Sequence, residues 1–150
     1  MRTAAVTVTL AAACLVLLPG QARTDAGLVR IFAVTHAVAQ ANVGPDRRSA
    51  GDLTVFGSRL HDRAGTPIGW ASLACMFLGR SLPAHTSQCQ GTYSLPRGKI
   101  MVAGTRQRVD YYLLAVVGGT GIYSRATGVL IVSTVDRNPR RERLLFSLES

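Results

Sequence analysis

Apolar and polar residues alternate in short runs along most of the chain, and glycine, proline and aspartate separate the runs. A period of two places alternate side chains on opposite faces of a strand, so the pattern predicts an all-β protein. We expect eight strands, spanning 28–43, 51–61, 67–79, 87–95, 99–108, 110–117, 126–134 and 141–148. Strands this short and evenly spaced are typical of a closed barrel or a sandwich, and closure would remove exposed strand edges.

Two segments leave alternatives open. The stretch 33–41 is rich in alanine and could form a helix, but the β-branched residues of 29–38 favour a strand. The segment 67–79 has apolar residues on both faces, so as a strand it must be covered on both sides.

A glycine-rich turn at 118–121 joins two apolar runs within Leu113 to Val132. Glycine adopts positive φ at little steric cost, so the turn predicts a hairpin. A phosphate-binding loop is disfavoured, because no helix follows whose N-terminal amides could bind the anion.

The first residues have the features of a secretory signal peptide. Met1-Arg2 gives a positive start, 6–18 is apolar, and small residues precede a cut after Ala22 or Ala26. An anchor helix is the alternative, disfavoured by the polar residues that follow from Gln21. We therefore expect a signal peptide and short leader over 1–26, one barrel domain over 27–150, and a secreted protein.

Charge adds little to this picture. The chain has 17 basic and 8 acidic residues, a net charge of +9, but the arginines are scattered, and aromatic residues are few and not interleaved with them. This argues against nucleic acid as a partner. No metal site is expected either, since His36, His61 and His85 lack ligand spacing. Cys75 and Cys89 fall on neighbouring strands, where they could face each other, and secretion favours a disulfide between them.

An ordered set of segments resembles the allene oxide cyclase and dirigent barrel superfamily, in particular its small bacterial members. The segments are Gly51-Asp52-Leu53 with Phe56 and Leu60, the turn 62–65 ending in Ile68-Gly69, the strand around Cys75, the hairpin 93–104, the run 114–121, Tyr123 and Ala126-Thr127-Gly128. The resemblance implies an eight-stranded antiparallel up-and-down barrel with an apolar cavity that acts on apolar small molecules without a metal or organic cofactor.

The resemblance extends to single positions. Ser58 occupies the place of a polar asparagine in the plant cyclases, and Cys75 matches a cysteine on their third strand. The same enzymes have a carboxylate on the first strand, whereas this sequence has no acidic residue between Asp25 and Asp46.

Candidate site residues follow from the strand faces around these positions. Asp52, Phe56, Ser58 and Leu60 share one face, and Ile68, Trp70, Ser72, Ala74 and Met76 share another. If both faces point inward, they combine apolar walls with a few polar groups, as small-ligand cavities do. The candidates are catalytic His36, Asp52 and Ser58, and substrate-binding Phe56, Trp70, Ser72, Met76 and Tyr93.

Each candidate also has a structural interpretation. The interior could be packed, Asp52 could bind backbone amides at the rim, and His36 is a candidate acid or base only if it faces the lumen. The functional hypothesis is a secreted barrel that binds an apolar unsaturated molecule and guides its cofactor-free cyclisation or isomerisation, as an isomerase or cyclase. The alternative is a non-catalytic ligand-binding or cell-envelope barrel. Either agrees with a homo-oligomer and needs no membrane span after signal removal.

Overall fold

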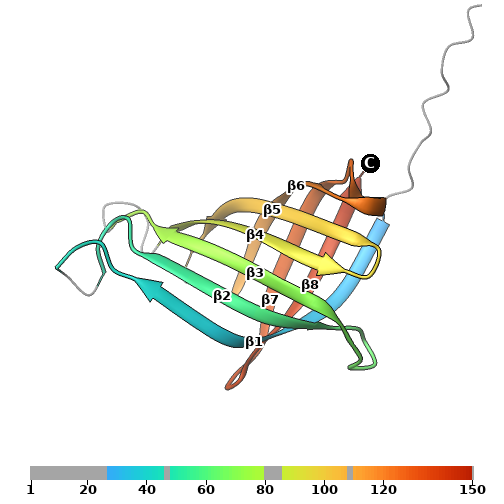
Figure 1. Ribbon diagram of the computed structural model, residues 1–150, viewed down its shortest axis with the longest axis horizontal. Coiled ribbons are helices and arrows are strands. Elements are labelled where there is room, and N and C mark those ends of the chain that lie inside the picture. The colour runs from blue at the N-terminus through green and yellow to red at the C-terminus, as the bar shows by residue number, and fades with distance from the viewer. Residues whose placement is uncertain (1–26, 46–47, 80–85, 108–109, 150) are drawn as a thin grey trace, which may run out of the picture.

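The computed structural model describes residues 27–45, 48–79, 86–107 and 110–149, so the expected signal peptide lies outside the described residues. Eight antiparallel strands close into a barrel in chain order, β1 to β8, with β8 returning to β1 (Figure 1). The strands are β1 (Gly27–Ala41), β2 (Leu53–His61), β3 (Pro67–Phe77), β4 (Ser87–Leu95), β5 (Gly98–Arg106), β6 (Tyr111–Gly119), β7 (Thr127–Arg137) and β8 (Arg140–Glu149). The all-β pattern is thus confirmed, and of the barrel and the sandwich that it allowed, the structure has the barrel that the family resemblance implies. No helix in these described ranges could cross a membrane.

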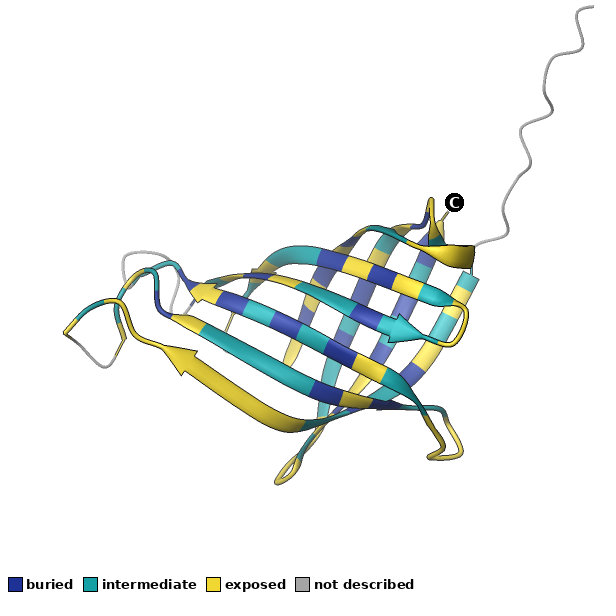
Figure 2. Cartoon of the chain, in the orientation of Figure 1, coloured by how far each residue is buried: buried dark blue, intermediate teal, exposed yellow. Residues whose placement is uncertain are grey.

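Burial alternates along β3 to β8 and the first half of β1, as the period of two requires, whereas the second half of β1 is exposed throughout (Figure 2). On β8, Leu144, Phe146 and Leu148 are buried while Arg141 and Arg143 are exposed. The interior is aliphatic with a few aromatic rings, and Tyr93 packs edge-on against Phe146 at 5.2 Å between centroids. The inward side chains of all eight strands therefore form one core.

β1 is the longest strand and joins both sides of the barrel. Its first half pairs with β8 and its second half with β2, with a bulge between Thr35 and Ala37. The alanine-rich segment is therefore a strand and not a helix. In a bulge, two residues of one strand lie opposite one residue of the other. His36 is therefore not part of the regular inward–outward alternation of β1.

One expectation about the lumen is wrong: the face of β3 that carries Trp70 and Met76 does not point inward. Ala71, Leu73, Cys75 and Phe77 are buried, whereas Trp70 is 51% and Met76 43% exposed. The face that carries Trp70, Ser72, Ala74 and Met76 is the outer one. The error has a clear source: both faces of this segment are apolar, and the inward face is set by its pairing with β2 and β4.

The glycine-rich turn forms a short 3-10 helix, η1 (Gly121–Tyr123), between β6 and β7. It packs against the β4–β5 hairpin, because the amides of Thr120 and Ile122 donate to the carbonyls of Lys99 and Arg97. Gly121 has φ +61°, and a Cβ there would lie 2.3 Å from the Arg97 carbonyl oxygen. Chain packing therefore requires glycine at position 121, which agrees with the predicted hairpin.

Candidate ligand-binding site

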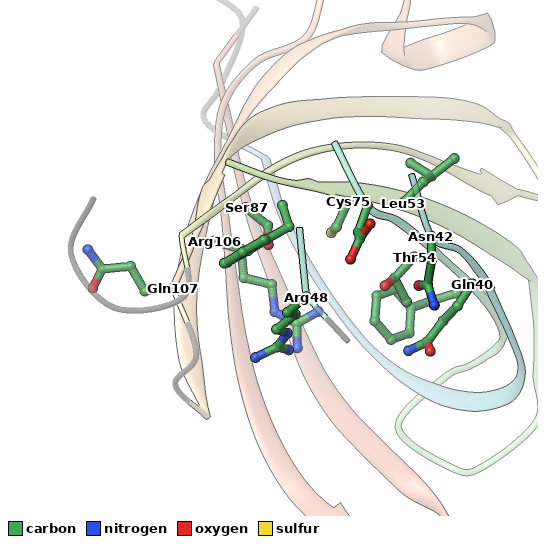
Figure 3. Close-up of a pocket in the computed structure, with 12 residues that line it drawn as sticks. Gln40, Asn42, Arg48, Leu53, Thr54, Cys75, Ser87, Arg106 and Gln107 are labelled. Carbon is green, nitrogen blue, oxygen red and sulfur yellow. The ribbon is translucent and has the colours of Figure 1, made fainter. Parts of the chain in front are cut away.

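The barrel lumen is packed in its depth and open at one mouth. Large side chains such as Leu60, Ile100, Leu130 and Phe146 are fully buried. A cavity of about 160 Å³ lies at the mouth (Figure 3). Inward side chains from the mouth ends of four strands help to line it: Thr54, Phe56, Cys75, Phe77, Ser87 and Arg106.

Among the described residues, two arginines and the carboxylate of Asp52 are the charged groups that line the mouth. The guanidinium of Arg106 lies 5.3 Å from the ring centroid of Phe56 and 4.6 Å from that of Tyr112. Arg48 lies 5.6 Å from the ring of Phe77. Stacking of a guanidinium on aromatic faces is favourable and limits where its donors point. The cavity therefore combines a few apolar side chains, Phe56 and Phe77 among them, with cationic hydrogen-bond donors in a largely polar lining.

The interior of the barrel also holds a buried carboxyl group. Glu142 is 8% exposed, on the inward face of β8. Its Oε1 accepts hydrogen bonds from Arg140 at 2.9 Å (Nε) and 2.7 Å (Nη2). A buried charge is stable only with such partners. Arg140 therefore supplies the hydrogen-bonding partner that this buried carboxyl group needs.

Two phenols complete the polar interior. Burial raises the pKa of Tyr112 above its usual range, and the charge of Glu142 and a hydrogen bond with it add to the shift. Burial also raises the pKa of Tyr93, with smaller contributions from Tyr112 and Glu142. Both residues therefore stay protonated at neutral pH and can act as hydrogen-bond donors.

Ser58 faces inward as expected. It is 7% exposed, and its hydroxyl lies 3.3 Å from that of Thr35 on β1. It belongs to the inner wall below the cavity, whereas Phe56, on the same face, reaches the cavity itself. Tyr93 lies deeper, packed on Phe146.

Asp52 lies at the rim and organises the β1–β2 connection. The amides of Val43 and Ser49 donate to its Oδ1 and Oδ2 at 2.9 and 2.8 Å. The Val43 hydrogen bond, then that of Ser49, holds the pKa of Asp52 below its usual range. A carboxylate so stabilised is a weak base, so the structural interpretation of Asp52 fits better than the catalytic one.

His36 does not face the lumen. It is exposed at the bulge of β1, and its Cε1 lies 3.7 Å from the Cβ position of Gly57. With Trp70 and Ser72 it borders a shallow hollow of about 360 Å³ on the outer surface. The predicted residues thus divide: Asp52, Phe56, Ser58 and Tyr93 lie at the lumen, whereas His36, Trp70, Ser72 and Met76 lie outside.

The disulfide is confirmed. Cys75 and Cys89 are direct partners of β3 and β4, with Cα atoms 4.1 Å apart and their sulfurs bonded. Cys75 also lines the cavity, so the bond forms part of its wall. Within the described ranges no group of three or more His, Cys, Asp or Glu side chains could hold a metal ion.

Known proteins resemble this chain in fold. No protein-family model matches it, and no curated protein sequence does. Among solved structures, a pyocyanin demethylase is 25% identical with a TM-score of 0.70, over 79% of this chain and 99% of that one. A nonspecific heme-binding cyclase that catalyses a [4+2] cycloaddition during neoabyssomicin biosynthesis is 18% identical with a TM-score of 0.68, over 83% of this chain and 64% of that one. The pterocarpan synthase dirigent protein GePTS1 is 13% identical with a TM-score of 0.65, over 95% and 99%.

The chain has the allene oxide cyclase/dirigent-like barrel fold. The position of Glu142 can be compared with the carboxylate that the resemblance places on the first strand. The carboxylate that the sequence resemblance places on the first strand is absent, yet Glu142 on β8 lies directly opposite Ala33 of β1. The barrel therefore receives an inward carboxylate from the neighbouring strand.

Sequence reasoning missed Arg106, Tyr112 and Glu142. One signal was present for Glu142: it precedes Leu144, Phe146 and Leu148 at a spacing of two, which puts a charge on an otherwise apolar face. Arg106 and Tyr112 gave no such signal, because strand ends carry polar and aromatic residues for many reasons.

Proposed function

We propose that this barrel binds a small, apolar, unsaturated molecule at the mouth of its lumen and guides a cofactor-free cyclisation or isomerisation of it. The observation that carries the proposal is Arg106, a cation that lies against two aromatic rings at the wall of a cavity lined by both polar and apolar side chains. The fold shared with cyclases and dirigent proteins supports the same reading.

The geometry suggests how the residues would divide the work. Phe56 and Phe77 would hold the ligand in one reactive conformation, which removes entropy from the barrier before the reaction. Arg106 would donate hydrogen bonds to an oxygen conjugated with the unsaturated system and stabilise charge that develops there. Tyr112 and Glu142 would act through Arg106, by fixing its position and its electrostatic surroundings.

The cavity limits the ligand. Its volume of about 160 Å³ is smaller than that of ordinary ligand pockets, which measure about 300–1,000 Å³. The ligand is therefore small, or Arg106 swings aside to admit it. The two arginines at the mouth favour molecules that carry an electron-rich oxygen or an acidic group.

The test uses a panel of small dienes, enones and aromatic heterocycles, with pyocyanin included. Binding is measured by calorimetry, and products of unchanged mass are sought by chromatography with mass spectrometry. Arg106→Met is expected to lower turnover or affinity at least about tenfold, the usual effect of losing a charged hydrogen-bond donor. Arg125→Met, on an exposed loop of η1 and β7, is the matched control. Equal activity of a folded Arg106→Met protein would refute the proposal.

A non-catalytic barrel that binds or carries a ligand is the second candidate. It is favoured by the partners that the charged groups near the lumen already have: Glu142 accepts hydrogen bonds from Arg140, and Arg106 lies against the rings of Phe56 and Tyr112. Native mass spectrometry of protein from the producing cells separates the two. Unchanged ligand supports binding, and a rearranged product supports catalysis.

We also propose that the protein is secreted after cleavage behind Ala22 or Ala26. The bond between Cys75 and Cys89 supports this, because disulfides persist mainly in oxidising compartments. Amino-terminal sequencing of the protein recovered from culture medium tests it. A cell-retained protein that begins at Met1 would contradict secretion.

A further inference from the structure

The outer surface of β8, β1 and β2 gathers arginines that the lumen does not use. We call this surface the arginine face; its members Arg30, Arg59, Arg63, Arg141 and Arg143 are all exposed. Strand pairing brings four of them together. Val34 of β1 has Arg59 on one side and Arg141 on the other, Phe32 lies opposite Arg143, and Arg30 lies opposite Leu145. Residues that the sequence scatters over more than a hundred positions thus share one side of the barrel.

These guanidinium groups lack ionic partners in the described part of the chain. The ion pairs found there join Arg137 to Asp110 and Arg140 to Glu142. Asp62 and Asp136 border the face, and each uses its Oδ1 for turn amides: those of Ala64 and Thr66, and those of Arg137 and Asn138. The arginine face therefore has excess positive charge.

Apolar side chains lie between the arginines. The guanidinium of Arg141 lies 4.7 Å from the ring centroid of Phe32. Trp70 is the strand partner of Arg59 and is 51% exposed. Two surface hollows flank Phe32: one of about 400 Å³ bordered by Arg30, Arg63, Arg143 and Leu145, and one of about 390 Å³ bordered by Val34, His61 and Arg141. Cationic rims thus surround apolar floors.

We propose that the arginine face docks the protein on an anionic phospholipid surface. Guanidinium groups bind phosphate through paired donors, and the apolar floors can receive the glycerol and upper acyl region beneath the headgroups. Exposed tryptophan is favoured at such an interface. A nucleic acid would be served by the charges but not by the aliphatic floors, so phospholipid fits better. Docking there would also bring the lumen close to membrane-dissolved apolar molecules, but it does not depend on the proposed chemistry.

The chain contains its own probe for this proposal. Trp70 is its one tryptophan and borders the arginine face. Its fluorescence is recorded with vesicles of phosphatidylglycerol and phosphatidylcholine in equal parts, and with phosphatidylcholine alone. We expect a blue shift with the anionic vesicles and quenching by brominated acyl chains in them. No change is expected with the zwitterionic vesicles.

Two triple variants with equal loss of charge locate the contact. Arg30→Gln/Arg59→Gln/Arg143→Gln removes three members of the face, and Arg97→Gln/Lys99→Gln/Arg125→Gln removes three exposed cations away from it. Each cation near an anionic bilayer strengthens binding about fivefold, so the first triple should weaken it roughly a hundredfold. The second should have a much smaller effect. Any contribution of the apolar segment 6–18 is the same in both.

Two results with vesicles would overturn the proposal: equal binding to both vesicle types, or an equal loss of vesicle binding in both triple variants. A third would be binding to duplex DNA by a protein whose Trp70 fluorescence is not quenched by the brominated lipid. Arg143→Glu alone gives a second check, because a reversed charge should weaken binding more than Arg143→Gln. All substituted side chains are exposed, and circular dichroism verifies that each variant is folded.

Discussion

Arg137 and Arg140 flank the same β7–β8 turn but form ion pairs of different kinds. The side chains of Arg140 and Glu142 are 28% and 11% exposed, and those of Arg137 and Asp110 are 78% and 55% exposed. Arg140→Met leaves a buried carboxylate without its partner and should lower the free energy of unfolding by about 1–3 kcal/mol. Arg137→Met should cost less than about 1 kcal/mol. Urea denaturation of both variants compares them, and equal losses would show that Glu142 does not need Arg140.

Asp52 gives a prediction on pH. Its folded pKa lies below the reference value of 3.8, so its contribution to stability is present above that pH and is lost as pH falls through the folded pKa. Asp52→Asn keeps one acceptor for the amides of Val43 and Ser49. The stability difference between wild type and variant should be constant near pH 6 and shrink below about pH 4. A difference that does not change down to pH 2 would contradict the assigned role.

Single residues also show where sequence reasoning succeeds. Ser58 and Phe56 share one face of β2 with the fully buried Leu60, and this face points inward, as the candidate site requires. His36 was not predictable, since the bulge that exposes it depends on pairing between β1 and β2. The cluster of Arg106, Tyr112 and Glu142 joins three strands, so no local pattern could reveal it.

At the scale of elements, the disulfide joins β3 and β4 across the connection that lies outside the described residues. Cys75 and Cys89 are 14 positions apart, and closing a loop of that size contributes roughly 3 kcal/mol. Cys75→Ala/Cys89→Ala should lower the free energy of unfolding by about this amount while leaving the barrel folded. Thermal and urea melts measure the loss. A loss below about 0.5 kcal/mol would mean that the bond does not limit the unfolded chain.

The η1 turn tests the packing argument for glycine. Gly121 and Gly65 both have positive φ, but a Cβ at Gly121 would meet the Arg97 carbonyl oxygen, whereas one at Gly65 has nothing within 4 Å. Gly121→Ala should therefore cost about 1–3 kcal/mol more than Gly65→Ala. Melting curves of the two variants measure this difference. Equal shifts of the melting temperature would mean that η1 can move away from the β4–β5 hairpin without cost.

At the scale of the whole molecule, a closed barrel or a sandwich could be predicted from the eight alternating segments, and the ordered motifs of the resemblance favoured the barrel. The division into a packed depth and an open mouth could not, because it depends on the stagger of strands around the barrel. The same holds for the arginine face. Its members appear scattered in the sequence, and the pairing of β8, β1 and β2 brings them together.

If the proposed function is right, a ligand occupies the mouth of the lumen and contacts Arg106. The most direct measurement is a crystal structure of the protein with the tightest-binding molecule of the panel. We expect this molecule to lie between Phe56 and Phe77, with an oxygen atom within hydrogen-bond distance of Arg106. A ligand found only on the outer surface, with the mouth filled by the protein's own side chains, would contradict it.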